Sequence, residues 1–279
     1  MEKIKIYYRI SDNSYPKTKL IGATKEVCLR NFCHTFSEAI SGQHVEVVCD
    51  NCHDATIKLV QDLGLPHIIT ADGNAGSLRL VLELALKHDE NTLIYSVEDD
   101  YLHLPIAPIL LQEGIKRADY VTLYDHPDKY TRVYNGGEHS KVIRTATSHW
   151  RYTASTCMTF CTMVKTLRED IDVWLKHTDG PHPHDHRIFI ELGKKQRRLA
   201  VCIPGVACHT DLAFSKTMST MLIDAWAIDL MIAELEKQLS GLKLDSNEEY
   251  HLMRKSLDVK CGKEKLMALD ALRLYFSAN

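Results

Sequence analysis

The sequence predicts an α/β protein in which a mixed, mostly parallel sheet of Rossmann-like type is flanked by helices, followed by a C-terminal helical extension. Three observations support this class. From Lys3 to about Val201, short apolar runs typical of strands alternate with stretches whose apolar residues recur every three or four positions. After Tyr124 the alternation breaks, and a hairpin is expected. Beyond Ser215 no strand pattern remains.

The first half of the chain is expected to form a βαβαβαβ unit with short loops. Strands are predicted over Lys3–Ile10, His44–Cys49, His67–Thr70, Thr92–Val97 and Tyr120–Tyr124. Apolar spacing near three and four residues predicts helices between them, over Lys25–Ile40, Ala55–Leu63, Ser77–Lys87 and Ala107–Arg117.

The second half is expected to be less regular. A hairpin is predicted from Arg132–Tyr134 and Lys141–Thr145 around Asn135-Gly136-Gly137. Then follow a strand near Ser148–Phe160, a helix over Lys165–His177, a loop over Asp179–His184, a helix from Asp185 to near Gly193 and a strand over Leu199–Cys208. Three final helices are expected over Met218–Leu239, Glu248–Ser256 and Lys263–Phe276. This organisation divides the chain into a domain over residues 1–214 and a helical extension over residues 215–279.

The final helices carry apolar stripes next to an acidic polar face. A helix that lies on a membrane surface needs a basic polar face, so we expect this extension to pack on the domain or, in a homo-oligomer, on another subunit.

Composition and charge exclude several classes of protein. Of the 279 residues, 45% are hydrophobic and 25% are charged, which is ordinary for a folded chain. The 34 basic and 37 acidic residues give a net charge of -3, and we expect no nucleic-acid partner. The start Met1–Ile6 alternates like a strand rather than a signal peptide, and no apolar stretch reaches the roughly 18 residues of a spanning helix. A cytoplasmic protein is expected, and its nine cysteines suit free thiols.

The strongest chemical signal is an apolar strand that ends in three consecutive acids, Glu98-Asp99-Asp100. In open α/β sheets, ligands gather at the carboxyl ends of the strands. Clustered carboxylates repel one another unless a cation or hydrogen-bond donors are present, and Mg²⁺ or Mn²⁺ is commonly held by one or two carboxylates together with substrate phosphates. A solvated acidic turn is the alternative.

This element resembles the Asp-x-Asp motif of glycosyltransferases with the GT-A fold. The ordered set of Glu98–His103, Arg9–Asp12 and Ser148–Arg151 resembles small viral and bacterial GT-A enzymes, a viral rhamnosyltransferase among them. The resemblance covers roughly Lys3 to Trp226. It implies a metal-dependent enzyme that takes a sugar from a nucleotide-diphosphate donor and transfers it to a carbohydrate or other hydroxyl acceptor.

The resemblance also implies roles for single residues. Asp100 becomes the metal ligand and Glu98 the contact to the donor ribose, while Asp99 is either a second polar contact or a structural one. His209, directly after a late strand, matches a position at which family members often have another metal ligand. A packed or surface histidine is the alternative.

Two further strand ends fit the nucleotide side of such a pocket. Arg9 and Asp12 follow the first strand and Asp50 follows the second, and Arg9 has the planar geometry that pairs with phosphate. Asp12 and Asp50 would equally serve as caps of loops or helices. The junction Asp72–Ser77 is a weak candidate for an oxygen-binding turn.

Asp185 is the candidate general base of an inverting transfer, because in inverting GT-A enzymes this base commonly lies at the start of the helix after the acceptor loop. The alternative is that Asp185 serves only as the N-cap of this helix. Asp125, His149 and Trp150 are candidate acceptor contacts, with a core position as the alternative for Trp150.

Two other classes compete with a glycosyltransferase. A sugar-phosphate nucleotidyltransferase shares the sheet and the metal chemistry, but it would open with a glycine-rich loop that Arg9–Asp12 lacks. A nucleotide-sugar binding protein would lack the ligands or the base. Separately, Cys49 and Cys52 form a CxxC pair. We interpret them as buried or half-buried thiols at a strand end, and a redox or metal site is the less favoured alternative.

Overall fold

The computed structural model describes residues 4–14, 19–20, 22–130, 138 and 140–211. The chain divides into two compact units, Met1–Met231 and Ile232–Asn279, and all of the described residues lie in the first. The predicted domain boundary at residues 214/215, the three final helices and any oligomer they form lie outside the described residues. Within those residues, no helix has both the length and the apolar character needed to cross a bilayer.

The centre of the described unit is a nine-stranded sheet in the order β3-β2-β1-β4-β9-β6-β10-β8-β7. Its strands are β1 Ile4–Ser11, β2 Val45–Asp50, β3 His67–Thr70, β4 Leu93–Glu98, β6 Tyr120–Thr122, β7 Val142–Arg144, β8 His149–Thr153, β9 Phe160–Met163 and β10 Leu199–Ile203. β9 and β8 run against the direction of the other seven. A second, two-stranded sheet joins β5 Tyr101–His103 to β11 Ala207–His209. The predicted α/β class is confirmed.

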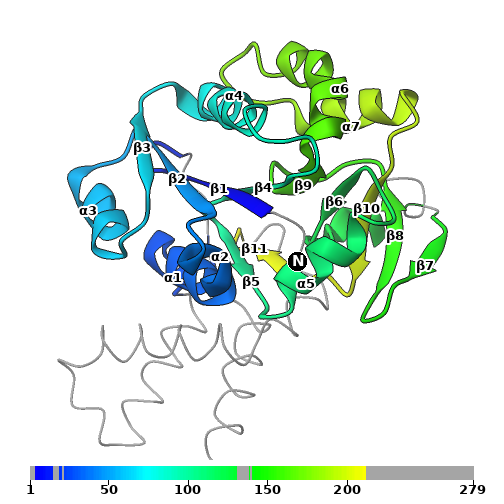
Figure 1. Ribbon diagram of the computed structural model, residues 1–279, viewed down its shortest axis with the longest axis horizontal. Helices are drawn as coiled ribbons and strands as arrows, with labels where there is room; N and C mark the ends of the chain where they lie inside the picture. Colours follow the sequence, from blue (N-terminus) through cyan, green and yellow to red (C-terminus); the bar gives the residue numbers. More distant parts are fainter. Residues whose placement is uncertain (1–3, 15–18, 21, 131–137, 139, 212–279) are drawn as a thin grey trace, which may run out of the picture. The chain divides into compact units, whose positions relative to one another are not determined.

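Helices cover both faces of the nine-stranded sheet (Figure 1). The helices are α1 Lys25–Thr35, α2 Ser37–Ser41, α3 Asp54–Asp62, α4 Gly73–Ala85, α5 Ala107–Gly114, α6 Val164–Lys176 and α7 Asp185–Lys194, with a 3₁₀ turn, η1, over Pro127–Tyr130. α4, α6 and α7 lie on one face and α1, α2 and α5 on the other. The strand period of two explains this sandwich: Ile6 and Tyr8 belong to the core cluster shared with α1 and α5, whereas Tyr7 belongs to the one shared with α4, α6 and α7.

Several predicted elements change in the structure. The strand expected near Ser148–Phe160 is divided into β8 and β9. The single helix expected over Lys25–Ile40 is broken at Phe36, whose backbone (φ -107°, ψ 28°) is not helical. The strand expected over Leu199–Cys208 splits at Pro204-Gly205, because proline has no N–H for the ladder. Gly205 is required there, since a Cβ would lie 2.8 Å from the Asp125 nitrogen.

The second strand of the predicted hairpin, Lys141–Thr145, is present as β7. β7 pairs with β8, so the two strands of the hairpin are Val142–Arg144 and His149–Thr153. The expected first strand Arg132–Tyr134 and the turn after it lie outside the described residues.

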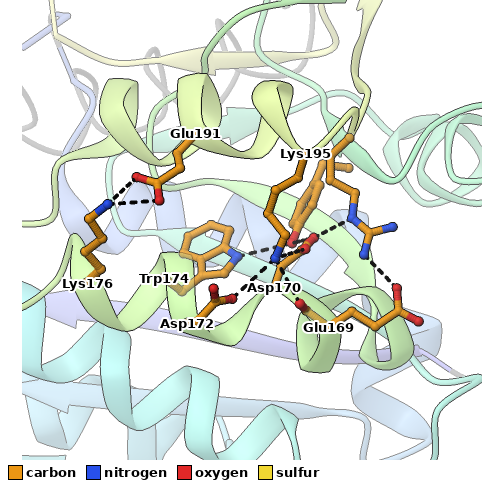
Figure 2. A network of polar contacts seen from close by, with 9 residues as sticks. Glu169, Asp170, Asp172, Trp174, Lys176, Glu191 and Lys195 are labelled. Atoms are coloured by element: carbon orange, nitrogen blue, oxygen red, sulfur yellow. Dashed lines mark hydrogen bonds and ion pairs between the residues drawn. The ribbon is translucent and has the colours of Figure 1, made fainter.

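A network of charged side chains joins α6, α7 and the start of β10 (Figure 2). The Asp170 carboxylate is completely buried, accepts a hydrogen bond from Arg197 Nε at 2.7 Å and lies 3.0 Å from Lys195 Nζ. The Tyr120 hydroxyl also donates to it, at 3.1 Å. The buried Asp170 charge is thus paired with two cations that keep contact with solvent, which fixes α6 against the sheet.

Candidate active site

A pocket of about 280 Å³ opens at the carboxyl ends of β1, β2 and β4. Its other walls are the first turn of α4 and the loop before α7. It is lined by Arg9, Ile10, Ser11, Asn13, Ser14, Asp50, Asn51, Gly73, Asn74, Ser77, Glu98, Asp99, Asp100, Pro181 and His182. Ligands of α/β sheets bind at this edge, and five of the sequence-predicted site residues line the pocket.

Arg9 and Glu98 form an ion pair on the pocket wall. The parallel register of β1 and β4 sets the two residues side by side, and Arg9 Nη2 donates to Glu98 Oε1 at 2.6 Å. Arg9, which is 6% exposed, also donates to the main-chain oxygen of Asn74 at 2.8 Å and to Ser77 Oγ at 3.3 Å. Arg9 therefore ties the end of β1 to the first turn of α4, and Glu98 balances its charge.

Asp99 has structural partners on the α1 side. Its Oδ2 accepts hydrogen bonds from the Ser11 backbone nitrogen at 3.0 Å and from Lys25 Nζ. Thr24 caps α1 by accepting from the Val27 nitrogen at 3.1 Å, which makes Lys25 the first helical residue and sets its position. These contacts agree with the structural alternative for Asp99, which also lines the pocket.

Asp100 and His209 lie together although 109 positions separate them in the chain. The antiparallel register of β11 and β5 sets His209 opposite Tyr101, and its Nε2 is 3.4 Å from Asp100 Oδ2. Both side chains are buried. His209 Nδ1 accepts a hydrogen bond from the Asp211 nitrogen at 3.1 Å, so in the neutral ring the proton is on Nε2 and faces Asp100.

The chemistry of the donor set tests whether a divalent cation fits here. Among the described residues, no group of three or more His, Cys, Asp or Glu side chains is arranged around a common point. Hard cations, however, need only one or two carboxylates when phosphate oxygens and water complete their coordination. Four carboxylates line the pocket, Asp50, Glu98, Asp99 and Asp100, against one arginine in the lining and Lys25 behind Asp99. A cation at Asp100 fits this acidic excess, whereas His209 Nε2 would first have to lose its proton.

Asp12 and Asp50 act as caps in the structure. Asp12 Oδ2 accepts from the backbone nitrogen of His53, the N-cap residue of α3, at 2.8 Å. Asp50 Oδ1 accepts from the nitrogen of Gly73, the first residue of α4, at 3.0 Å. These bonds agree with the capping alternative, and Asp50 also lines the pocket.

Asp185 is the first residue of α7, and His184 is the N-cap residue. Asp185 Oδ1 accepts a hydrogen bond from the His186 nitrogen at 2.6 Å, and burial raises the pKa of the Asp185 carboxyl group. The loop before it contacts α4 through a hydrogen bond from the Ala75 nitrogen to the Pro181 oxygen at 3.4 Å. Asp185 therefore follows directly on a loop that forms one wall of the pocket.

The Cys157 thiol links Asp185 to the acid triplet. Burial, together with the negative charges of Asp185, Glu98 and Asp100, raises the pKa of this thiol to about 12. The three carboxylates all lie close enough to act on one sulfur atom. The structure therefore brings Asp185 and the end of β4 to the same region.

Asp125 does not face an acceptor, which corrects the sequence-based expectation. It is 4% exposed, and Arg151 Nη2 donates to its Oδ1 at 2.6 Å. Tyr130 donates to the other oxygen, and Arg151 also pairs with Glu138. Asp125 is thus occupied by a buried ion pair.

Trp150 is corrected as well, because it is completely buried and packs against Gly114, where a Cβ would lie 2.6 Å from the indole ring. Its Nε1 donates to Thr145 Oγ1 at 2.9 Å. His149 is exposed and lies at the pocket edge of the sheet, but β8 is four strands from β4, about 19 Å at the usual strand spacing. It lies outside the pocket.

Two pocket components were missed or underrated in the sequence. Lys25, which holds Asp99, has no sequence signal beyond its place at a helix start. The turn Asp72–Ser77 did carry a signal, its glycines before a helix, and the structure puts Gly73, Asn74 and Ser77 in the pocket wall.

No protein-family model and no curated protein matches the sequence. Several solved structures are similar in fold. S. aureus TarS 1–349 has 14% identity and a TM-score of 0.43, covering 95% of this chain and 83% of that chain. Galactosyltransferase LgtC in complex with donor and acceptor sugar analogues has 7% identity and a TM-score of 0.40 over 71% and 72% of the chains. CMP:2-keto-3-deoxy-manno-octonic acid synthetase complexed with CTP has 12% identity and a TM-score of 0.46 over 80% and 100%.

At these values the likeness concerns a loosely similar arrangement of helices and strands. It includes a sugar-transferring and a nucleotide-transferring enzyme, and we infer no substrate or reaction from it. The narrower likeness to a viral rhamnosyltransferase receives no support from these structures.

Proposed function

We propose that this protein is a metal-dependent glycosyltransferase that moves a sugar from a nucleotide-diphosphate donor to a hydroxyl acceptor with inversion. The observation that carries the proposal is the acid-rich pocket at the carboxyl ends of β1, β2 and β4. Its excess of carboxylates would repel a diphosphate unless a cation were bound as well.

The donor would bind with its diphosphate near Asp100. A cation there would neutralise the charge that develops on the leaving diphosphate. Asp100 would hold it, with His209 as the second ligand once its ring proton has moved from Nε2 to Nδ1, which ends the hydrogen bond from the Asp211 nitrogen. The remaining pocket residues would bind the nucleoside: Glu98 stands where a ribose contact is expected, and Asp50, Asn51 and Asn74 offer oxygen and amide groups at the opposite wall.

Asp185 would remove the proton of the acceptor hydroxyl. A general base is most effective when its pKa approaches the operating pH, and burial shifts the pKa of Asp185 upward, in that direction. The same carboxylate supports the start of α7 through the His186 nitrogen, so the cap and base roles are compatible.

A sugar-phosphate nucleotidyltransferase would use a similar acid-rich pocket, and it is the second candidate. The end of β1 and the first residues after it disfavour it, because Arg9–Asn13 contains no glycine to wrap a triphosphate with main-chain nitrogens.

Incubation with radiolabelled nucleotide sugars, with Mn²⁺ or with a chelator, tests the proposal. Manganese-dependent sugar transfer, or slow donor hydrolysis without an acceptor, is the expected result, and NMR of the product should show inverted configuration. Pyrophosphate-dependent exchange with nucleoside triphosphates would instead identify a nucleotidyltransferase. Binding without either reaction would identify a nucleotide-sugar binding protein.

A further inference from the structure

Cys49 and Cys52 lie next to each other at the edge of the pocket. Cys49 is the second-to-last residue of β2 and pairs in register with Ile10 of β1. Asn51, with φ at 50°, turns the chain back after the strand. As a result Cys52 Sγ donates a hydrogen bond to the main-chain oxygen of Ile10 at 3.3 Å, beside Cys49.

The two cysteines pack in the same core cluster and differ in access to solvent. Their thiols titrate as a pair, so their interaction lowers the pKa for loss of the first proton and raises the pKa for loss of the second. Cys49 is completely buried, whereas Cys52 is half-buried. α3 begins at Asp54, just beyond the pair, and thiolates are favoured near the positive end of a helix. The arrangement provides an accessible thiol and a protected partner within its reach.

We propose that Cys49 and Cys52 are a dithiol site that closes to a disulfide by exchange with small disulfides such as oxidised glutathione, and that closure weakens ligand binding in the adjacent pocket. In the first step the Cys52 thiolate attacks one glutathione sulfur, forming a mixed disulfide and releasing one glutathione thiolate. In the second, the Cys49 thiolate attacks Cys52 Sγ and releases the other. The protein loses two protons and two electrons, and oxidised glutathione gains both.

The effect on the pocket follows from the residues between and beside the cysteines. Asp50 and Asn51 stand between them in the sequence, and both line the pocket, as does Ile10. A disulfide removes the Cys52 thiol hydrogen that is donated to Ile10. It also constrains Asp50, whose carboxylate holds the first residue of α4. The coupling rests on the proposed function, whereas disulfide formation does not.

A metal site is less well supported than a redox pair. Thiolate metals such as zinc need three or four protein ligands, and within the part of the chain that the structure describes no third Cys, His, Asp or Glu completes a group with these two cysteines.

The test treats the full-length protein with glutathione buffers of graded ratio, followed by alkylation of free thiols and peptide mass spectrometry. We expect a reversible bond between Cys49 and Cys52 that dithiothreitol reduces. C52A should abolish it and C49A should stop at a glutathione adduct on Cys52, whereas C33A, which removes another half-buried thiol, should leave it unchanged. Only a glutathione adduct on the wild-type protein, or no reaction, would overturn the dithiol site.

The second part measures nucleoside diphosphate affinity with Mn²⁺ in the reduced and oxidised protein. We expect oxidation to weaken binding by roughly 5- to 150-fold, the usual range for coupled sites, with no change in C52A. Equal affinity in both states would overturn the coupling. Absence of binding in the reduced protein would instead defeat the proposed function, while mass spectrometry still decides whether the disulfide forms.

Discussion

The Asp170 network and the pocket at the end of β4 are both clusters of acidic side chains, but they differ in how their charges are balanced. Asp170 is surrounded by Arg197, Lys195 and Tyr120 in a closed contact between α6, α7 and the sheet (Figure 2). In the pocket, four carboxylates and one arginine line a hollow of about 280 Å³. The first arrangement matches its charges within the fold and therefore serves stability. The second leaves an acidic excess at a ligand-sized opening, which favours binding of a cation.

Asp185→Asn should produce the largest functional effect. Because a general base contributes ~10²–10⁴-fold to rate, kcat should fall by about that factor while donor affinity stays near wild type. The amide oxygen still accepts from His186, so the helix start should persist. The acid limb of the rate–pH profile, which we expect above the ordinary carboxyl range because the pKa of Asp185 is raised, should disappear.

Asp179→Asn is the matched control, an exposed acid in the loop before α7. It should retain wild-type kcat. Full activity in Asp185→Asn, or a product with retained configuration, would remove Asp185 from this role and leave Asp211 as the next carboxylate to test.

Asp170→Ala should produce the largest effect on stability. Removal of the carboxylate leaves Arg197 and Lys195 without their buried partner, and we expect the free energy of unfolding to fall by about 3 kcal/mol, at the low end for a broken buried pair since both cations keep some contact with water. Asp172→Ala removes an exposed partner of the same Lys195 and should cost less than about 0.5 kcal/mol. Urea denaturation measures both, and equal values would contradict the distinction.

The contrast between the clusters was only partly visible in the sequence. Strands that are apolar runs bounded by turns were predicted well, and β3 has the predicted bounds His67–Thr70. β5 was missed because it has only three residues and its partner β11 lies about a hundred positions later. Local composition cannot reveal such pairing.

Site residues show the same limit. The acid triplet was found because a strand ends there, and its partner His209 because of a family pattern. Asp125 and Trp150 were misassigned because their fates depend on Arg151 and Gly114, whose proximity only the tertiary structure creates. Polar neighbours in sequence do not determine whether a side chain is buried.

The buried His103 in β5, just after the acid triplet, should make the stability of the fold depend on pH. Burial lowers the pKa of His103 from about 6.5, its value in the unfolded chain, to about 3 in the folded protein. Between these two pH values the unfolded chain binds more protons than the folded one, so stability falls as the pH decreases. From pH 7 to pH 5 the loss should be on the order of 2 kcal/mol. His103→Gln should lose this part of the pH dependence and exposed His149→Gln should keep it. Equal slopes of unfolding free energy against pH in all three proteins would contradict the assignment.

His209→Ala should produce the smallest of these effects. Its Nε2 proton faces Asp100 because the Asp211 nitrogen donates to Nδ1, so metal binding through Nε2 requires the ring proton to move to Nδ1 and the Asp211 hydrogen bond to break. We expect the apparent Mn²⁺ affinity in the presence of nucleotide to fall by about tenfold or less, as for groups that support a ligand. A Mn²⁺ titration followed by electron paramagnetic resonance measures it. An unchanged constant would exclude His209 as a ligand.

The central claim is that the acidic excess at the end of β4 binds a nucleoside diphosphate together with a divalent cation. Thermal unfolding of the wild type and Asp100→Asn, with a panel of nucleoside diphosphates and with or without Mn²⁺, tests it most directly. With ligand at about 100 times its dissociation constant, the wild-type melting temperature should rise by roughly 5–10 °C, and only when nucleotide and metal are both present. Asp100→Asn should fold as well as the wild type and show no such rise. A metal-dependent rise of equal size in both proteins would contradict the claim.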